Sequence, residues 1–210
     1  MCSRMTIAMG VGSVEILLLR HGKTQGNLEQ RYVGRTDEPL LPSAAAELAQ
    51  SEYRDFCPDL VYTSPMLRCR QTAEILFPEC VSGGSRLIVC GGLRETDFGV
   101  FEYKTYDELK ENFIYQAWID SGGTVAVPGG ESGTDFRTRC RRAFLACLCQ
   151  AQTSGVQKIV FVTHGGVIMS VMEEFARPRA DFYSWQLPNG SAYLVRTGGS
   201  AAAVDLYVLS

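Results

Sequence analysis

Histidine is scarce in this sequence: the 210 residues contain only two, His21 and His164, which lie far apart in the chain. A zinc site needs ligand pairs at short spacing, and the H-E-x-x-H pattern of metalloproteases needs two histidines within one helix. Neither pattern is present. The sequence therefore predicts no metal site, and it leaves both histidines free for other chemistry.

Long hydrophobic runs are also missing, although hydrophobic residues make up 46% of the chain. The longest uncharged apolar run falls far short of the roughly 18 residues that a membrane-spanning helix needs. Positive charge is not in excess either, because the net charge is −3 and the pI is about 5.5. Proteins that bind polyanions are usually basic. We therefore expect neither a membrane nor a nucleic acid as the main partner.

The eight cysteines form no C-x-x-C pair, and several of them, such as Cys90 and Cys147, lie in apolar segments. This pattern is typical of buried free thiols in a reducing compartment. Residues 1–13 lack the apolar core and the small-residue cleavage site of a secretory signal. We expect a loose arm over residues 1–13 and a cytoplasmic protein.

Apolar segments of two kinds alternate along the rest of the chain. Short runs predict buried strands at 14–19 and 87–90 and further strands at 60–62, 158–163, 191–196 and 204–209. Longer segments predict helices at 43–56, 66–77 (ended by Pro78), 131–152 and 167–175, and a loop at 81–86. This alternation indicates an α/β fold, a three-layer α/β/α sandwich with a mostly parallel central sheet. We expect one domain over 14–210, with a small aromatic-rich helical lid at about 103–127.

Each histidine directly follows a predicted strand and is itself followed by glycine, as His21-Gly22 and His164-Gly165. In an open α/β sheet, ligands bind beyond the carboxyl ends of the strands. The whole histidine content of the chain therefore falls on the edge where a ligand is expected.

Two arginines and an acid are predicted at the same edge. Arg20 precedes the first histidine, Arg68 lies in the first turn of the helix after strand 60–62, and Glu95 follows strand 87–90. Arginine forks match the oxygens of a phosphate group. Together with the histidines, these residues predict a site for a compact dianion.

Sequence motifs that include these residues run in order from about residue 17 to 195: Arg20-His21-Gly22-Lys23-Thr24 with Asn27, Tyr62-Thr63-Ser64-Pro65-Met66-Leu67-Arg68, Leu93-Arg94-Glu95, Pro128-Gly129-Gly130-Glu131-Ser132 and Thr163-His164-Gly165-Gly166. In this order and spacing they make the sequence resemble the histidine phosphatase superfamily, in its phosphoglycerate mutase-like branch.

The resemblance implies that His21 is the nucleophile and becomes phosphohistidine, and that Glu95 donates a proton to the leaving oxygen. It also implies that four residues hold the phosphoryl oxygens: Arg20, Arg68, His164 and Asn27. Thr24 and Gly165 are implied to bind the substrate as well. Because the arginines supply the positive charge, no metal and no cofactor is implied. The implied partner is a small phosphorylated metabolite.

Three features depart from the family pattern. Tyr103 stands where relatives often have glycine, and residues 40–44 lack the usual hydroxyl and glycine at the start of the first long helix. Lys23 replaces the more usual acidic residue or glutamine and adds a positive charge at the rim of the predicted site.

Several activities remain open at this point. Residues 117–120, leading into the turn at 128–130, resemble α-ribazole-phosphate phosphatases, and a sugar phosphate is another candidate substrate. A mutase would transfer the phosphoryl group between hydroxyls, but the interval between Glu95 and Pro128 lacks the twin arginines of mutases and has only Lys104 and Lys110 as cations. A phosphate-binding module without activity would need neither His21 nor Glu95.

One further motif, Cys80 to Arg86, fits the C-x5-R pattern of cysteine-dependent phosphatases. That chemistry needs the motif between a strand and a following helix, so that the helix N-terminus receives the phosphate. Here a helix is predicted before the motif and a strand after it, so we do not expect this mechanism.

Overall fold

The computed structural model of the protein describes residues 13–83, 86–198 and 204–209. Apart from Ser13, the arm expected over residues 1–13 lies outside the described residues.

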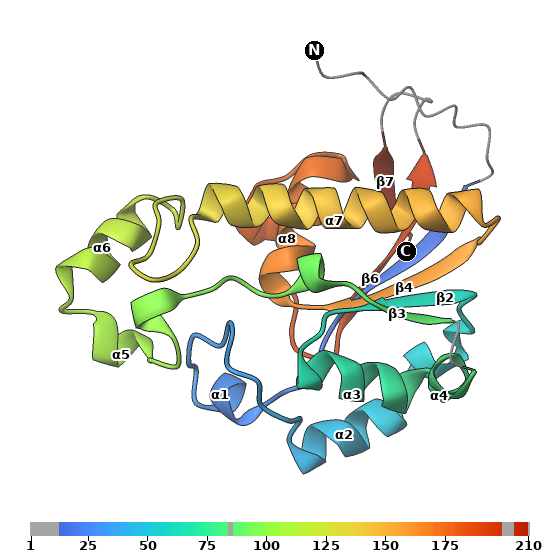
Figure 1. Ribbon diagram of the computed structural model, residues 1–210, viewed down its shortest axis with the longest axis horizontal. Coiled ribbons are helices and arrows are strands. Elements are labelled where there is room, and N and C mark those ends of the chain that lie inside the picture. The colour runs from blue at the N-terminus through green and yellow to red at the C-terminus, as the bar shows by residue number, and fades with distance from the viewer. Residues whose placement is uncertain (1–12, 84–85, 199–203, 210) are drawn as a thin grey trace.

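A single seven-stranded sheet forms the centre of the molecule (Figure 1). Its strands, in the order β3-β2-β4-β1-β6-β7-β5, are β3 (Leu87–Val89), β2 (Leu60–Thr63), β4 (Lys158–Thr163), β1 (Glu15–Arg20), β6 (Ala192–Gly198), β7 (Asp205–Val208) and β5 (Ala176–Arg177). Strands β1 to β4 run parallel to one another, and β6 is antiparallel to both of its neighbours. The expected mostly parallel sheet is therefore confirmed, with the short β5 added at one edge.

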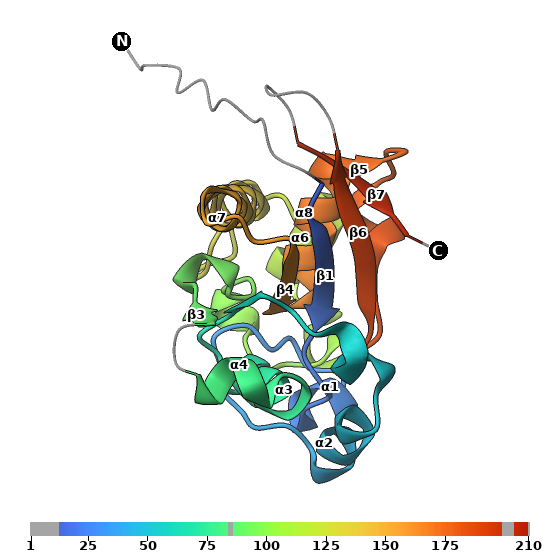
Figure 2. The same ribbon diagram turned by 90° about the vertical axis from the view of Figure 1, so that its right-hand side faces the viewer.

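Helices cover both faces of this sheet, because successive side chains of a strand point to opposite faces. On β1, Ile16 and Leu18 pack with helices α7 (Gly133–Thr153) and α8 (Gly165–Phe175). Leu17 and Leu19 face the other way and pack with α2 (Pro42–Ala49) and α3 (Leu67–Leu76). Figure 2 shows these two helical layers on either side of the sheet, which makes the predicted three-layer sandwich.

Three predicted elements differ from the structure. Strand β3 is a half-exposed edge strand, with Val89 50% exposed, because it pairs only with β2. The first long helix ends at Ala49, and Glu52–Phe56 forms a separate 3-10 turn. Pro78 begins the short helix α4 (Pro78–Ser82), which runs into the segment expected to be loop, since the fixed φ of proline suits a first helical turn. As the missing hydroxyl predicts, Leu41 makes no side-chain hydrogen bond at the start of α2.

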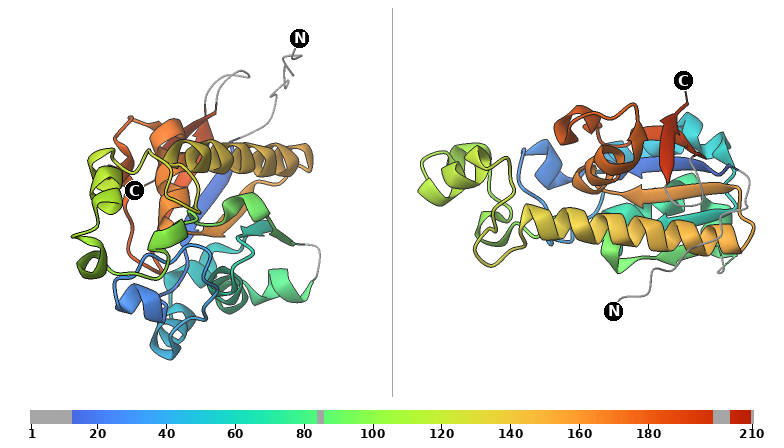
Figure 3. Two further views of the ribbon diagram at one scale, coloured as in Figure 1. Left: turned by 60° about the vertical axis from the view of Figure 1, so that its left-hand side comes forward. Right: turned by 90° about the horizontal axis from the view of Figure 1, so that it is seen from above.

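The region expected as a lid contains two helices, α5 (Tyr106–Leu109) and α6 (Phe113–Asp120). Both views of Figure 3 show this yellow-green segment beyond one end of the sheet. It has a small core of its own, in which Phe101 and Tyr115 are buried. Tyr103 adopts a φ of 61°, the left-handed region that favours glycine, and its hydroxyl donates a hydrogen bond to Glu38 (3.2 Å).

The seven cysteines among the described residues are all free thiols, four of them buried. Within the same residues, no helix is both long and apolar enough to span a membrane.

Candidate active site

His21 lies at the carboxyl end of β1, where the buried strand leaves the sheet. Its backbone N–H donates to the carbonyl of Thr163 (2.9 Å), so the pairing of β1 with β4 continues to the histidine. The ring is 3% exposed, and Nδ1 lies 2.7 Å from the carbonyl oxygen of Gly22. Because a carbonyl only accepts hydrogen bonds, Nδ1 carries the proton and the lone pair of the neutral ring is on Nε2. The side chain is thereby arranged as a nitrogen nucleophile.

His164 occupies the equivalent place at the end of β4, immediately before α8. Its ring meets that of His21 edge-on, with centroids 5.1 Å apart. It is fully buried, and Nε2 lies 2.8 Å from the hydroxyl of Ser64, which follows β2. The thiol of Cys69 lies 3.6 Å from the same nitrogen. The two histidines therefore share one buried centre, as their strand positions predict.

Two arginines lie beside the histidines with part of each guanidinium unsatisfied. Arg68 is 0% exposed and donates through its terminal nitrogens to the carbonyls of Thr36 (2.8 Å) and Gly34 (3.0 Å). Arg20 donates to the carbonyl of Leu187. The Nε atoms of both arginines are buried without a hydrogen-bond partner. Buried donors are nearly always paired in proteins, so these two point to an anionic ligand.

Burial and the neighbouring arginines act on both histidines in the same direction. Desolvation lowers the pKa of His21 well below its usual value, and the positive charges of Arg68 and Arg20 lower it further. Desolvation and the charge of Arg68 likewise lower the pKa of His164. A low pKa keeps the imidazole of His21 neutral, which is the nucleophilic form.

These shifted pKa values predict how stability depends on pH. Below about pH 6.5 the unfolded chain binds protons on both histidines while the folded protein does not, so the free energy of unfolding should fall with falling pH. Each histidine contributes up to about 1.4 kcal/mol per pH unit. Urea titrations at pH 7.5, 6.5 and 5.5 measure the decline, and NMR resolves the two imidazoles directly because the chain has no others. A constant free energy of unfolding, or an imidazole that titrates near 6.5, would contradict the prediction.

Glu95 reaches the same centre from the segment after β3. Its carboxylate accepts hydrogen bonds from the backbone N–H of Gly166 (3.1 Å) and of Thr96 (3.0 Å). The guanidinium of Arg139, on α7, donates to the carbonyl of Glu95 (3.3 Å) and is paired with Glu131. The carboxyl group of Glu95 is therefore held between the start of α8 and the side of α7. Burial lowers the pKa of Arg20, and the charge of Glu95 offsets part of that lowering.

A cleft of about 840 Å³ opens above this centre. Four of the predicted site residues line it: Arg20, Asn27, Glu95 and Gly165. His21, Arg68 and His164 are buried beside them. Thr24 is also fully buried, and its side chain and backbone form a reciprocal capping box with Asn27 at the start of α1 (Gln25–Leu28). Thr24 thus contacts Asn27, and Asn27 reaches the cleft.

The cleft also contains residues that the sequence analysis did not identify. Arg137 from α7 stacks its guanidinium 4.2 Å from the ring of Phe182 and pairs with Glu173. Six aromatic rings line the cleft: Tyr32, Phe98, Trp118, Phe136, Phe182 and Tyr183. Trp118 belongs to the predicted aromatic-rich lid and to the segment 117–120 that resembles α-ribazole-phosphate phosphatases, whereas no motif in the sequence distinguishes Arg137, Phe182 or Tyr183.

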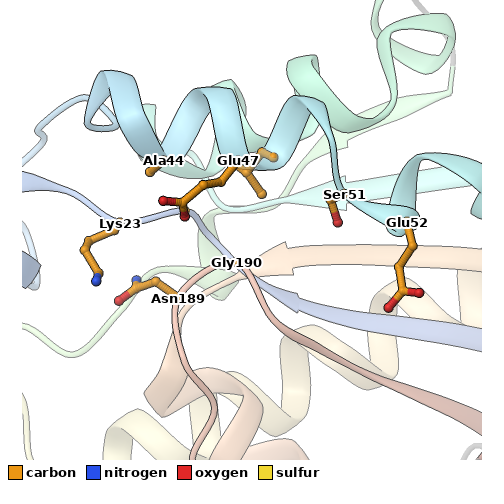
Figure 4. Close-up of a pocket in the computed structure, with 9 residues that line it drawn as sticks. Lys23, Ala44, Glu47, Ser51, Glu52, Asn189 and Gly190 are labelled. Carbon is orange, nitrogen blue, oxygen red and sulfur yellow. The ribbon is translucent and has the colours of Figure 1, made fainter.

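Within the described residues, no group of three or more histidine, cysteine, aspartate or glutamate side chains is arranged to bind a metal ion. A second hollow, of about 430 Å³, is lined by Lys23, Glu47 and Gly190 (Figure 4), together with Gly22. Glu52 also lines this hollow, and Asn189 lines both the hollow and the cleft. Glu95 and Arg20 line the cleft and not this hollow.

Residues 16–209 match the model of the histidine phosphatase superfamily (branch 1). The chain belongs to this superfamily. A probable phosphoglycerate mutase, GpmB of Erwinia tasmaniensis, is 31% identical over 166 residues, which cover 76% of this chain and 74% of the relative.

Solved structures of the superfamily share the fold. The α-ribazole phosphatase of Shigella flexneri superimposes with a TM-score of 0.75 at 25% identity, covering 93% of this chain and 96% of that one. Phosphoglycerate mutase from Thermus thermophilus superimposes with a TM-score of 0.65 at 31% identity, covering 87% and 92%. Both phosphatases and mutases therefore occur among the similar proteins.

Proposed function

We propose that the protein is a metal-independent phosphomonoesterase that hydrolyses a small phosphorylated metabolite through a phosphohistidine intermediate. One observation carries the proposal: the Nε2 lone pair of His21 lies in a buried centre with two guanidinium groups whose Nε donors are unpaired. A nucleophile surrounded by fixed donors for phosphoryl oxygens is what transfer through a covalent intermediate requires.

The first chemical step forms a bond between Nε2 of His21 and phosphorus and breaks the bond from phosphorus to the leaving oxygen. Arg20, Arg68, His164 and Asn27 donate to the phosphoryl oxygens, and the proton on Glu95 goes to the leaving oxygen. In the second step water attacks phosphorus, the bond from phosphorus to Nε2 of His21 breaks, and the water gives a proton back to Glu95. Inorganic phosphate leaves and His21 is restored, so one set of donors stabilises both transition states.

The aromatic walls of the cleft support a leaving group that carries a flat ring. Rings stack on such a group and contribute about 0.5–1.5 kcal/mol per pair beyond the burial of area. α-Ribazole 5′-phosphate has this character, and the Shigella flexneri neighbour is named an α-ribazole phosphatase. A sugar phosphate is the alternative substrate.

A panel of phosphomonoesters tests the activity and its substrate class together. We expect phosphate release from α-ribazole 5′-phosphate with a kcat/KM at least about tenfold above that of a simple sugar phosphate. Activity should persist in excess chelator, because Arg20 and Arg68 supply the positive charge. Loss of activity on chelation that added Mg²⁺ or Zn²⁺ restores would refute metal independence, and equal rates on all esters would refute the preference for a ring.

Mutase activity is the second candidate, because the Erwinia tasmaniensis relative is a probable phosphoglycerate mutase. A mutase must keep water away from its phosphohistidine and hold a second phosphate group. The short interval between Glu95 and Pro128 offers only Lys104 and Lys110 for that task. Supplying 3-phosphoglycerate with a trace of 2,3-bisphosphoglycerate separates the two activities: we expect phosphate release to exceed formation of 2-phosphoglycerate, and the reverse would favour the mutase.

Gly166 gives a further prediction, because it leaves the space that Glu95 occupies. A Cβ at this position would lie 2.5 Å from Oε1 of Glu95 and 3.0 Å from the ring of Phe136. Gly166→Ala should therefore displace the carboxylate and lower kcat about 10- to 100-fold. Gly91→Ala is the matched control, because a Cβ at Gly91 meets no atom within 4 Å. Wild-type kcat in Gly166→Ala would show that the position of Glu95 is unimportant.

A further inference from the structure

The turn at residues 189–191, just before β6, is hydrogen-bonded to the end of β1 on the side away from β4. The backbone N–H of Arg20 donates to the carbonyl of Ser191 (3.0 Å). The N–H of Gly190 is shared between the carbonyls of Arg20 and His21, each at 3.1 Å. Gly190 has a φ of 75°, which favours glycine and turns its N–H toward the strand end.

Asn189 in this turn adds two side-chain hydrogen bonds. Its Nδ2 donates to the backbone carbonyl of His21 (3.2 Å) and to Oδ1 of Asn27 (3.0 Å). The orientation of the amide is determined, because a backbone carbonyl accepts only and must face the NH2 group. Both N–H donors of Asn189 are therefore committed, one to the nucleophile's backbone and one to a cleft residue.

The amide of Asn27 is oriented by the same logic. Its Oδ1 accepts from the backbone N–H of Thr24 (3.2 Å) and from Asn189. Because a backbone N–H only donates, the atom that faces Thr24 must be the oxygen. The NH2 group of Asn27 is then the part left for the cleft that this residue lines.

We propose that Asn189 is a positioning residue for the phosphoryl-transfer site. It holds Asn27 with its NH2 group available to a phosphoryl oxygen, and it fixes the backbone of His21, whose ring is in turn held by Gly22. The remaining polar atom of the Asn189 side chain, Oδ1, is an acceptor and cannot donate to a phosphoryl oxygen. Asn189 therefore acts through Asn27 and His21. This inference rests on the proposed function.

Substitutions at Asn189 test the inference with p-nitrophenyl phosphate as substrate and vanadate as competitor. Asn189→Ala should lower kcat/KM about 10- to 100-fold and weaken inhibition by vanadate by a similar factor. Losses of this size are expected when hydrogen bonds that support a charged ligand are removed. Asn189→Asp has the same size but turns a carboxylate toward two acceptor oxygens, so it should lose more activity than Asn189→Ala. If Asn189 merely filled space, the aspartate variant would rank close to the wild type.

A double-mutant cycle with Asn27→Ala measures whether Asn189 acts through Asn27. In the Asn27→Ala background we expect Asn189→Ala to weaken inhibition by vanadate by less than about threefold, because the amide group that Asn189 orients is already absent. Glu47→Ala, on the wall of the hollow in Figure 4, is the control and should keep wild-type kcat/KM. Circular dichroism melts select folded variants, and Asn189→Ser replaces Asn189→Ala if the latter does not fold.

Each outcome has one meaning. Wild-type vanadate inhibition in Asn189→Ala, or fully additive losses in the cycle, would overturn the role of Asn189 while leaving the proposed function intact. A wild-type protein that releases no phosphate from any ester would instead refute the proposed function.

Discussion

Replacing His21 with alanine is expected to abolish phosphoenzyme formation and to lower turnover by at least about 10³-fold. The loss should be this large because neither Cys69 nor His164 is free to replace the imidazole of His21. The thiol of Cys69 lies beside His164, and burial raises its pKa to about 12, so it stays protonated. His164 is held at Nε2 by Ser64. Brief incubation with a ³²P-labelled ester followed by an alkaline quench should trap label on the wild type that acid then releases.

The control for this experiment is the fold of the variant. His21→Ala should give the circular dichroism spectrum of the wild type, because the backbone hydrogen bond from His21 to Thr163 does not depend on the imidazole ring. Turnover above a few per cent of the wild type, or acid-labile label on the variant, would mean that another residue accepts the phosphoryl group.

Glu95→Gln is expected to give a loss that depends on the leaving group. A general acid contributes about 10²–10⁴-fold, so kcat should fall by a factor in that range for alkyl phosphates, whose leaving oxygen needs a proton. The kcat for p-nitrophenyl phosphate should fall far less, because nitrophenolate leaves without a proton. The ratio of the two losses is the quantity to measure.

Comparison of the two esters also separates proton transfer from positioning. Both carboxylate oxygens of Glu95 accept backbone N–H groups, and glutamine retains only one acceptor oxygen. Any disturbance of the nearby arginines would slow the hydrolysis of both esters alike. Equal losses on the two would therefore show that Glu95 orients the site and does not donate a proton.

The strand-end residues of the site could be predicted from sequence because parallel strands bring their carboxyl ends to one edge. His21 and His164 follow β1 and β4, which are neighbours in the sheet, and Arg68 lies in the first turn of the helix after β2. Local apolar runs predict such strands, and strand direction then decides which residues meet.

The walls of the cleft could not be predicted in this way. Arg137 and Phe182 come from the side of α7 and from a turn after α8, and their contact depends on how helices pack over the sheet. Helical periodicity shows which stripe of α7 is apolar but not which polar residue faces the substrate. Asn189 was missed for the same reason, since its partners His21 and Asn27 are distant in the chain.

The error at β3 also has a physical cause. Residues 87–89 are apolar, which is typical of a buried strand, but position in the sheet depends on the order of pairing, and β3 is last in that order. An apolar run indicates a preference for strand structure, but it does not indicate how many other strands will pair with that strand.

The direct contact between the ends of β1 and β4 has a consequence for the protein during its synthesis. His21 is made early and His164 late, and the two join only when the backbone N–H of His21 meets the carbonyl of Thr163. Closing so long a loop costs chain entropy before the pairing returns any stabilisation. With the function proposed above, the growing chain on the ribosome cannot act on phosphate esters until the segment with His164 has emerged and entered the sheet, however compact its N-terminal half has become.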